Sequence, residues 1–118
     1  MKRRSDLARL QDARRFAQDA VGHAIGLSPE TLAEALQPQH AALYALTVVG
    51  EALAQIPIDL RNEAPGIAWK SIIGLRNHLI HAYWQIDLEI IADVIKNRID
   101  PLMAELDKLI TFVERIEK

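Results

Sequence analysis

The sequence predicts an all-α protein built as an up-and-down bundle of four to five helices. Apolar residues recur at spacings of three and four along most of the 118 residues, whereas no stretch alternates apolar and polar residues as a half-buried strand does. Half of the residues are apolar, and the five Gly and five Pro are too few for a disordered or linker-rich chain. We therefore expect residues 1–118 to form one helical domain with a modest core.

The first two helices have recognisable ends. Leu and Ala residues spaced by three and four predict an amphipathic helix over residues 5–25, which Gly26 stops. Ser28 followed by Pro29 is typical of a helix start, because Ser caps the free N–H groups and Pro fits the first turn. A short helix is expected over residues 29–36.

The middle of the chain predicts two longer helices joined by a connector. Pro38 ends the short helix, and a long apolar helix follows from residue 40 to about residue 55. Residues 57–65, bounded by proline at both ends, predict a connector with one helical turn. The next helix is expected from about residue 66 to residue 80 or beyond.

The last helix is expected to start at a cap formed by Asp87 and to continue to about Glu114. Pro101 lies inside this helix and predicts a kink or an interruption, because proline lacks the N–H that donates to the preceding turn. No internal repeat or low-complexity tract accompanies this helical pattern.

Composition excludes several classes of protein. The absence of Cys removes disulfides, thiolate catalysis and thiolate metal sites, and it fits a reducing cytoplasm. No apolar run reaches the ~18–20 residues that span a bilayer, and the charged N-terminus lacks the apolar core of a signal peptide. We expect a soluble cytoplasmic protein that needs no membrane, metal ion or cofactor.

Residues 76–83 concentrate chemically active side chains in an otherwise Leu-, Ile- and Ala-rich helix. Arg76 offers a fixed cation with a planar fork of donors that matches a phosphate. His81 belongs to the residue type that gives or takes protons near neutral pH. Together they could hold a phosphodiester and move protons on it, which is the minimum that a metal-independent ribonuclease needs.

Helix geometry separates these two residues. Each residue turns a helix by ~100°, so Asn77 and His81 share a face, whereas Arg76 and His81 lie about 140° apart. Three arrangements would unite them: Arg76 swings round, the helix ends near Ile80, or a two-fold axis places the Arg of one chain beside the His of another. A lone chain is therefore expected to be a poor catalyst.

The motif and its surroundings resemble HepT-like ribonuclease toxins of the HEPN-domain superfamily. The R-x-x-x-x-H-x-Y pattern of that group runs from Arg76 through His81 to Tyr83. Four further stretches are similar to its P-x-I-x-W-x-x-I-x-G-x-R-N run, its mid-helix G-E-A and its last helix: residues 65–77, 49–52, 86–91 and 99–102. The resemblance covers roughly residues 5–115, although the first helix matches only loosely.

The resemblance implies a HEPN-like bundle that dimerises around one composite cleft and cleaves RNA without a metal ion. His81 would take a proton from the ribose 2′-hydroxyl or give one to the leaving oxygen. Arg76 would stabilise charge on the phosphorane, and Asn77 would orient Arg76 or bond a phosphate oxygen. Because the 2′-hydroxyl is the nucleophile, DNA should not be cut. The implied partners are RNA, a second copy and a cognate nucleotidyltransferase-type antitoxin, as in a type VII-like toxin–antitoxin pair.

Three neighbouring residues carry open alternatives. The Tyr of HepT-like toxins that corresponds to Tyr83 is a target for adenylylation by the antitoxin, but Tyr83 could equally cover the core with its hydroxyl in water. Glu51 stands among apolar residues and either meets solvent or pairs with Arg76 and pre-aims it. His78 is expected to be a solvated bystander, because no further ligands accompany His78 and His81 at metal-binding spacing.

Charge is uneven along the chain, although a net charge of −2 argues against a broad basic surface that wraps nucleic acid. Six basic residues lie near the N-terminus: Lys2, Arg3, Arg4, Arg9, Arg14 and Arg15. They form either a solvated helix face with a loose start, or a group in which Arg9 or the Arg14–Arg15 pair guides RNA toward a cleft.

Two other functions fit the same motif. One is a non-catalytic nucleotide- or substrate-binding subunit of a minimal nucleotidyltransferase, in which Arg76 and His81 hold a nucleotide without cutting it. Ribonuclease activity that is lost in His81→Ala would exclude this function. The other is a purely structural helical dimer, which a change in stability without a change in binding in Arg76→Ala would favour.

Overall fold

The computed structural model describes residues 4–117, and these residues are helical apart from short connectors. Four longer helices form the framework: α1 (Asp6–Ala24), α3 (Leu36–Ala54), α5 (Trp69–His81) and α7 (Ile99–Ile116). Shorter elements join them: α2 (Pro29–Glu34), α4 (Ile58–Asn62), the 3₁₀ turn η1 (Tyr83–Gln85), α6 (Leu88–Asp93) and the π-helical turn η2 (Val94–Arg98). No strand occurs in residues 4–117, and the expected all-α bundle is confirmed.

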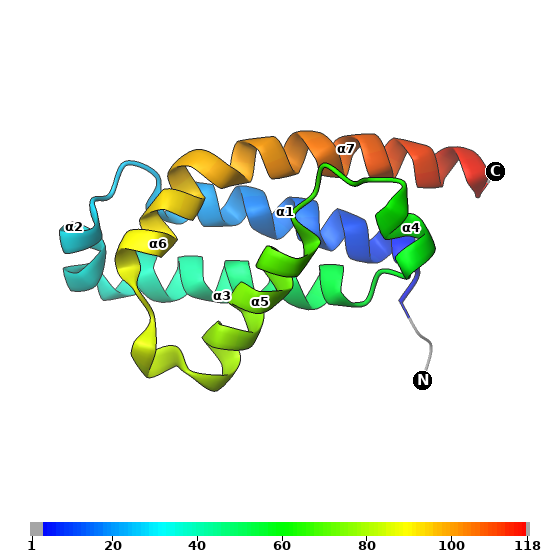
Figure 1. Cartoon of the computed structure of the whole chain (residues 1–118). Helices are drawn as coiled ribbons and strands as arrows, with labels where there is room; N and C mark the ends of the chain where they lie inside the picture. Colours follow the sequence, from blue (N-terminus) through cyan, green and yellow to red (C-terminus); the bar gives the residue numbers. More distant parts are fainter. Residues whose placement is uncertain (1–3, 118) are drawn as a thin grey trace.

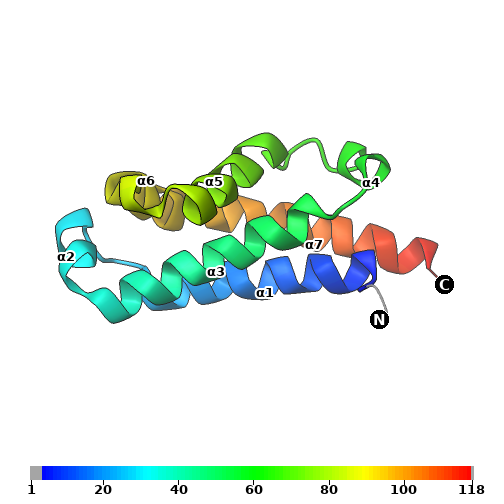
Figure 2. The ribbon, with the colours of Figure 1, turned by 90° about the horizontal axis from the view of Figure 1, so that it is seen from below.

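The long helices pack in two layers (Figures 1 and 2). Helices α1 and α3 run antiparallel side by side, and α7 packs along α1. Helix α5 crosses α3 at an angle, and α5 and α6 lie on the same side of the α1–α3 pair. Helix α5 buries only Leu79, whereas α1, α3 and α7 each bury five residues or more. Helix α5 therefore presents most of its surface outward.

The core of the described chain consists of apolar side chains only. Helix α1 contributes a stripe of small residues, including Ala13 and Ala17, which lets α1 and α3 pack closely together. Leu53 of α3 and Leu106 of α7 are completely buried, and each such leucine contributes ~1.5–3 kcal/mol through removal of apolar surface from water. Within residues 4–117, no helix combines the length and the apolar composition that crossing a bilayer requires.

The helix ends expected from the sequence are present at three places. Ser28 Oγ accepts a hydrogen bond from the Thr31 N–H at 3.1 Å at the start of α2. Asp87 accepts one from the Glu89 N–H at 2.9 Å ahead of α6. Gly26 follows α1 with φ at +83°, in the left-handed region that glycine enters without a Cβ clash.

Two helix boundaries differ from the expectation. Helix α2 ends at Glu34 and α3 begins at Leu36, four residues before the expected start. Pro38 therefore lies in the first turn of α3 instead of ending the preceding helix. A first turn tolerates proline, because its N–H groups have no partner within the helix. Helix α5 begins late, at Trp69, because the chain first closes a turn on the carbonyl of Ala64.

The expected interruption of the last helix takes the form of the π-helical turn η2, just ahead of Pro101. Pro101 has no N–H to donate to the preceding turn, and the wider turn accommodates the lost bond. At the end of α6, Asp93 accepts a hydrogen bond from Asn97 at 2.7 Å and pairs with Arg98 at 3.6 Å. The Asn97 hydrogen bond and the Arg98 charge hold the pKa of the Asp93 carboxyl below its ordinary value.

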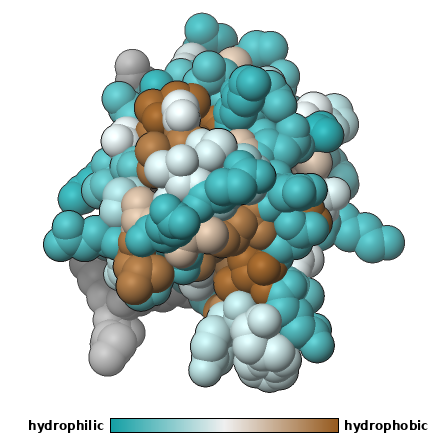
Figure 3. Space-filling view, turned by 90° about the vertical axis from the view of Figure 1, so that its left-hand side faces the viewer, coloured by the Kyte–Doolittle hydropathy of each residue, from teal (hydrophilic) through white to brown (hydrophobic). Residues whose placement is uncertain are grey.

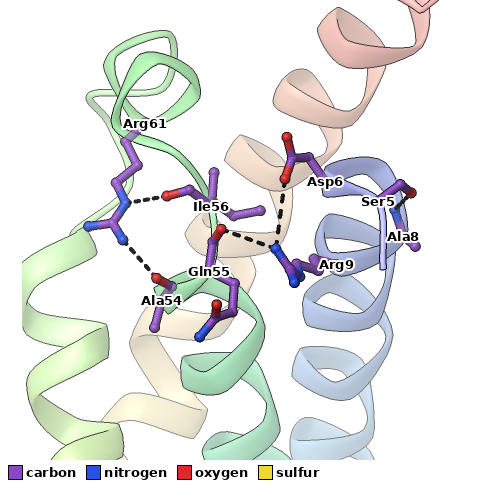
Figure 4. A network of polar contacts seen from close by, with 8 residues as sticks. All are labelled: Ser5, Asp6, Ala8, Arg9, Ala54, Gln55, Ile56 and Arg61. Atoms are coloured by element: carbon purple, nitrogen blue, oxygen red, sulfur yellow. Dashed lines mark hydrogen bonds and ion pairs between the residues drawn. The ribbon is translucent and has the colours of Figure 1, made fainter. Parts of the chain in front are cut away.

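Two arginines cap the C-terminal end of α3 (Figure 4). Arg61 donates from Nε to the Ile56 carbonyl at 2.9 Å and from Nη2 to the Ala54 carbonyl at 3.0 Å. Arg9 donates from Nη1 to the Gln55 carbonyl at 3.3 Å. These bonds satisfy carbonyls that have no partner within the helix, and they fasten α4 and α1 to the same end of α3.

Candidate functional site on helix α5

Helix α5 carries the Arg/His motif and crosses α3 where Gly50 faces Arg76. A Cβ atom at position 50 would overlap the Cβ of Arg76 and would lie 2.8 Å from its Cγ. Glycine is therefore the residue type that lets the two helices meet at this depth. This close approach brings Glu51, the next residue of α3, within reach of the Arg76 guanidinium.

The guanidinium of Arg76 is held by two oxygen-bearing side chains. Its Nε and Nη2 atoms lie 2.7 and 2.6 Å from Oε1 of Glu51, and its Nη1 donates to Oδ1 of Asn77. The pairing of Glu51 with Arg76 that the sequence left open is thus present. Because an arginine has five N–H donors and three are engaged, two remain for a ligand.

His81 is the last residue of α5, and its side chain is exposed. It follows Asn77 by one helical turn, so both side chains lie on the outward face of the helix. Among the hydrogen bonds of the described residues, none joins Arg76 to His81, and Arg76 is tied to Glu51 on the α3 side. The helix runs through His81 and Arg76 does not swing round, so one chain alone leaves this pair apart.

The chain turns after α5 and presents two aromatic side chains to solvent. Tyr83 and Trp84 are 67% and 68% exposed, and their rings pack edge to face with centroids 5.5 Å apart. Tyr83 therefore does not cover the core, which was one of the two alternatives for it. The Tyr83 phenol is therefore exposed to solvent, two residues beyond His81.

His78 contributes a local contact to the same connector. Its Nε2 atom lies 3.4 Å from the carbonyl oxygen of Gln85, which ties the end of α5 to η1. The bystander role expected for His78 stays a prediction. Across residues 4–117, no group of three or more His, Cys, Asp or Glu side chains is arranged to hold a metal ion.

Two hollows flank α5, and sequence reasoning missed both. One has a volume of about 490 Å³ and lies between α3, α5 and the α6–α7 segment, with Asp93 in its lining. The other has a volume of about 590 Å³, lies between α4 and α5 and reaches Asn77. The second hollow had a detectable signal, because Lys70, Gly74 and Asn77 follow one another at the spacing of helical turns.

The N-terminal arginines make contacts that serve the fold. Arg14 donates from Nε to Asp107 of α7 at 3.0 Å, and Arg9 caps the end of α3. These contacts give Arg9 and Arg14 structural roles, whereas Arg15 is exposed and lies over the ring of Phe16. Lys2 and Arg3 lie outside the described residues.

Known proteins resemble this chain over most of its length. A family model described as Ribonuclease HepT-like matches residues 7–109. A predicted RNase of Methanocaldococcus jannaschii is 37% identical over 76 residues, which cover 64% of this chain and 63% of that protein. Another predicted RNase of the same organism is 29% identical over 114 residues, which cover 97% of this chain and 94% of that protein.

A further relative is a predicted ribonuclease HepT of Thermococcus cleftensis, 35% identical over 71 residues that cover 60% of this chain and 64% of that protein. The alignments to this relative and to the first one thus span slightly less than two thirds of the relatives' own length. No solved structure matches the chain. The family model nevertheless spans both the Gly50–Arg76 crossing and the motif at the end of α5. The chain therefore belongs to the HepT-like ribonuclease family.

Proposed function

We propose that this protein is a metal-independent endoribonuclease that works as a homodimer and acts as the toxin of a type VII-like toxin–antitoxin pair. One observation carries the proposal: in a HepT-like chain, Glu51 and Asn77 hold Arg76, and the same helix ends in an exposed His81. The arginine supplies an oriented cation for a phosphate, and the histidine supplies an accessible proton carrier.

The proposed reaction is an internal transesterification of RNA. The ribose 2′-oxygen forms a bond to the adjacent phosphorus, and the bond from phosphorus to the 5′-oxygen of the next nucleotide breaks. One copy of His81 takes the 2′-hydroxyl proton, and the His81 of the second copy gives a proton to the leaving 5′-oxygen. The free N–H groups of Arg76 bind the non-bridging oxygens, where negative charge gathers. The products carry a 2′,3′-cyclic phosphate and a 5′-hydroxyl.

A second copy completes this site. Because Arg76 and His81 lie on different sides of α5, a two-fold axis beside α5 would supply each His81 with the Arg76 of the other chain. Exposed apolar side chains beside the motif support such a contact, namely Ile80, Tyr83 and Trp84. Figure 3 shows apolar patches on the end of the molecule that α2, α6 and the connector after α5 form.

Adenylylation of Tyr83 by a cognate nucleotidyltransferase-type antitoxin would switch the enzyme off. The phenol oxygen attacks the α-phosphorus of ATP and pyrophosphate leaves, so that Tyr83 gains a bulky anion. The exposure of Tyr83 supports this proposal, because the transferase must reach the hydroxyl. An anion beside His81 would repel RNA and compete for the free donors of Arg76.

One observation favours a second candidate function. In a single chain Arg76 keeps two N–H donors that Glu51 and Asn77 do not engage, and no hydrogen bond among the described residues joins His81 to Arg76. Such an arrangement suits the holding of a nucleotide phosphate more than its cleavage. The alternative is a non-catalytic nucleotide- or substrate-binding subunit of a minimal nucleotidyltransferase.

The deciding experiment measures RNA cleavage by the purified protein in the presence of a metal chelator, after mass spectrometry has shown that Tyr83 is unmodified. The wild type should produce cyclic-phosphate ends and should leave DNA of the same sequence intact. Arg76→Ala and His81→Ala should each lower the rate by about 10² or more. His23→Ala is the matched control, because His23 is exposed in the last turn of α1 and far from the motif in the sequence.

Intact RNA after incubation with unmodified wild-type protein would contradict the ribonuclease proposal. An ATP titration by calorimetry would then distinguish the alternatives. Binding that is lost in Arg76→Ala would support the nucleotide-binding subunit.

A further inference from the structure

The solvent-facing side of α5 carries a line of three polar side chains. Asn77 lies seven positions after Lys70, and His81 follows four positions later. At ~100° per residue, these three side chains fall within about 40° of one another around the helix. All three are exposed. At ~1.5 Å per residue, the line from Lys70 to His81 spans about 16 Å along the helix axis.

The hollow of about 590 Å³ opens along this line, between α4 and α5. Lys70 and Asn77 both belong to its lining, and Ile73 and Gly74 lie between them on α5. Apart from Gly74, its two chain neighbours and the surrounding backbone of α5, no atom lies within 4 Å of the position that a Cβ at Gly74 would take. The hollow is therefore open above the helix backbone at Gly74, where a planar ligand group can approach.

The end of the hollow near the start of α5 is held in place by Trp69 and Arg61. Trp69 donates from its indole Nε1 to the Ala64 carbonyl at 3.0 Å. The Arg61 guanidinium lies 5.5 Å from the centroid of the Trp69 ring. Its Nε and Nη2 atoms donate to the carbonyls of Ile56 and Ala54 (Figure 4). This end of the hollow requires little reordering when a ligand binds, which lowers the entropic cost of binding.

The charge of the hollow suits an anion. Its polar lining consists of Arg61, Asn62, Lys70 and Asn77, without a carboxylate. Among the described residues, the ion pairs do not include Lys70. A cation that no carboxylate neutralises attracts an anionic group. Lys70 is such a cation, and it lines the same hollow as Asn77 of the motif.

We infer that this hollow binds the nucleotide next to the cleaved phosphodiester of a single-stranded RNA, an inference that rests on the proposed ribonuclease function. Lys70 binds the outer phosphate of that nucleotide, and Asn77 bonds its sugar or its inner phosphate. Ile73 and Gly74 form the floor on which the ribose and base lie. An unstacked base can enter such a hollow, whereas a duplex would need the broad basic surface that a chain of net charge −2 lacks.

Fluorescence anisotropy across a salt series tests this inference, with a short single-stranded RNA whose 2′-hydroxyls are methylated so that it cannot be cleaved. Lys70→Ala should weaken binding about fivefold at low salt. It should also lower the slope of log affinity against log salt by about 0.7, the value for one phosphate contact to a single strand. Gly74→Leu should weaken binding by filling the hollow, without clashing with the fold. Lys96→Ala is the matched control, because it removes the same charge from η2.

Cleavage assays provide a second readout. Lys70→Ala should lower kcat/KM more on an oligonucleotide than on a dinucleoside monophosphate, because the latter has no flanking phosphate. An unchanged salt slope in Lys70→Ala would overturn the inference and leave the ribonuclease intact, provided that the wild type binds and cleaves RNA. Failure of the wild type to bind the RNA would overturn both. Sedimentation of Lys70→Ala measures whether the dimer persists. Loss of the dimer would show that the line from Lys70 to His81 contacts a second copy, and this result would overturn the RNA site.

Discussion

The two sides of α5 differ in how many contacts their side chains make within one chain. On the side that faces α3, Gly50 admits Arg76 to close range and Glu51 holds its guanidinium at 2.6–2.7 Å. On the solvent side, His81 ends the helix in an exposed position, and the exposed Tyr83 and Trp84 follow it. The Arg76 guanidinium is thus fixed by tertiary structure, whereas the His81 imidazole and the Tyr83 phenol are left accessible.

This difference separates two ways in which a substitution can act. A change on the α3 side alters both the helix packing and the orientation of the Arg76 guanidinium, because Arg76 is part of the helix crossing. A change at His81 on the solvent side should leave the core undisturbed, because the side chain is exposed. The predictions below test whether the two sides separate in this way.

The largest effect is expected from the solvent side. His81→Ala should lower kcat/KM for RNA by about 10²–10⁴, the contribution of a positioned general acid or base. The free energy of unfolding should change by no more than about 0.5 kcal/mol, because the side chain is exposed. Single-turnover cleavage and urea unfolding of the same preparation measure the two quantities. A large loss of stability would show that His81 belongs to the packed side of the helix.

The next effect is expected at the helix crossing. Gly50→Ala places a methyl group where the Arg76 side chain begins, so α3 and α5 must move apart. Overpacking of this kind should cost about 1–3 kcal/mol in the free energy of unfolding. Cleavage should fall as well, because the displaced Arg76 no longer meets Glu51 in the same geometry. Urea unfolding and cleavage rates measure both losses.

Gly22→Ala provides the matched control for this substitution. Gly22 is an exposed position in α1, and no atom lies within 4 Å of an added Cβ there. Alanine should therefore be neutral or should stabilise the helix by up to about 1 kcal/mol. Equal destabilisation by the two substitutions would show that the crossing is not tight at Gly50.

Local signals explain how much of the fold the sequence could predict. The cap at Ser28 and the left-handed Gly26 depend on neighbours within a few residues, so their residue types are informative by themselves. The expectation that Pro38 ends the short helix was wrong. Proline can either end a helix or lie in its first turn, and only the packing of α3 decides between these two positions. The π-helical turn ahead of Pro101 likewise depends on how α6 and α7 pack against the rest of the bundle.

The candidate site divides along the same line. Arg76 and His81 could be chosen as candidates from the sequence, because their side-chain chemistry and the motif around them can be recognised within a short stretch of the chain. The pairing of Arg76 with Glu51 stayed an alternative, because it requires α3 and α5 to cross at Gly50, a tertiary fact. The spacing of Lys70, Gly74 and Asn77 marks one wall of the hollow beside Asn77, but the opposite wall comes from α4, a segment that the sequence predicted only as a connector.

A smaller effect is expected from Glu51. Glu51→Ala frees the Arg76 guanidinium to adopt other orientations, and kcat should fall by about tenfold while KM changes little. Stability should change by no more than about 1 kcal/mol, because the Glu51 side chain is 46% exposed and solvent screens the ion pair. Glu51→Gln keeps a hydrogen-bond acceptor and should restore part of kcat. An unaltered kcat in Glu51→Ala would mean that the α3 side does not aim the cation.

The smallest effect is expected on the other flank of α5, where Asp93 lines the hollow of about 490 Å³. The hydrogen bond from Asn97 and the charge of Arg98 lower the pKa of Asp93 below 3.8 in the folded chain. Its ionised form therefore favours the fold above the ordinary pKa, and this contribution disappears as the pH falls through the folded pKa. Asp93→Asn should lower Tm slightly near neutral pH, and the difference from wild type should close as the pH falls through the lowered pKa of Asp93. Cleavage at neutral pH should stay at the wild-type rate, because Asp93 does not lie on the line from Lys70 to His81. A loss of cleavage would show that RNA also contacts this flank, and the solvent side of α5 would then extend around the helix to the hollow beside η2.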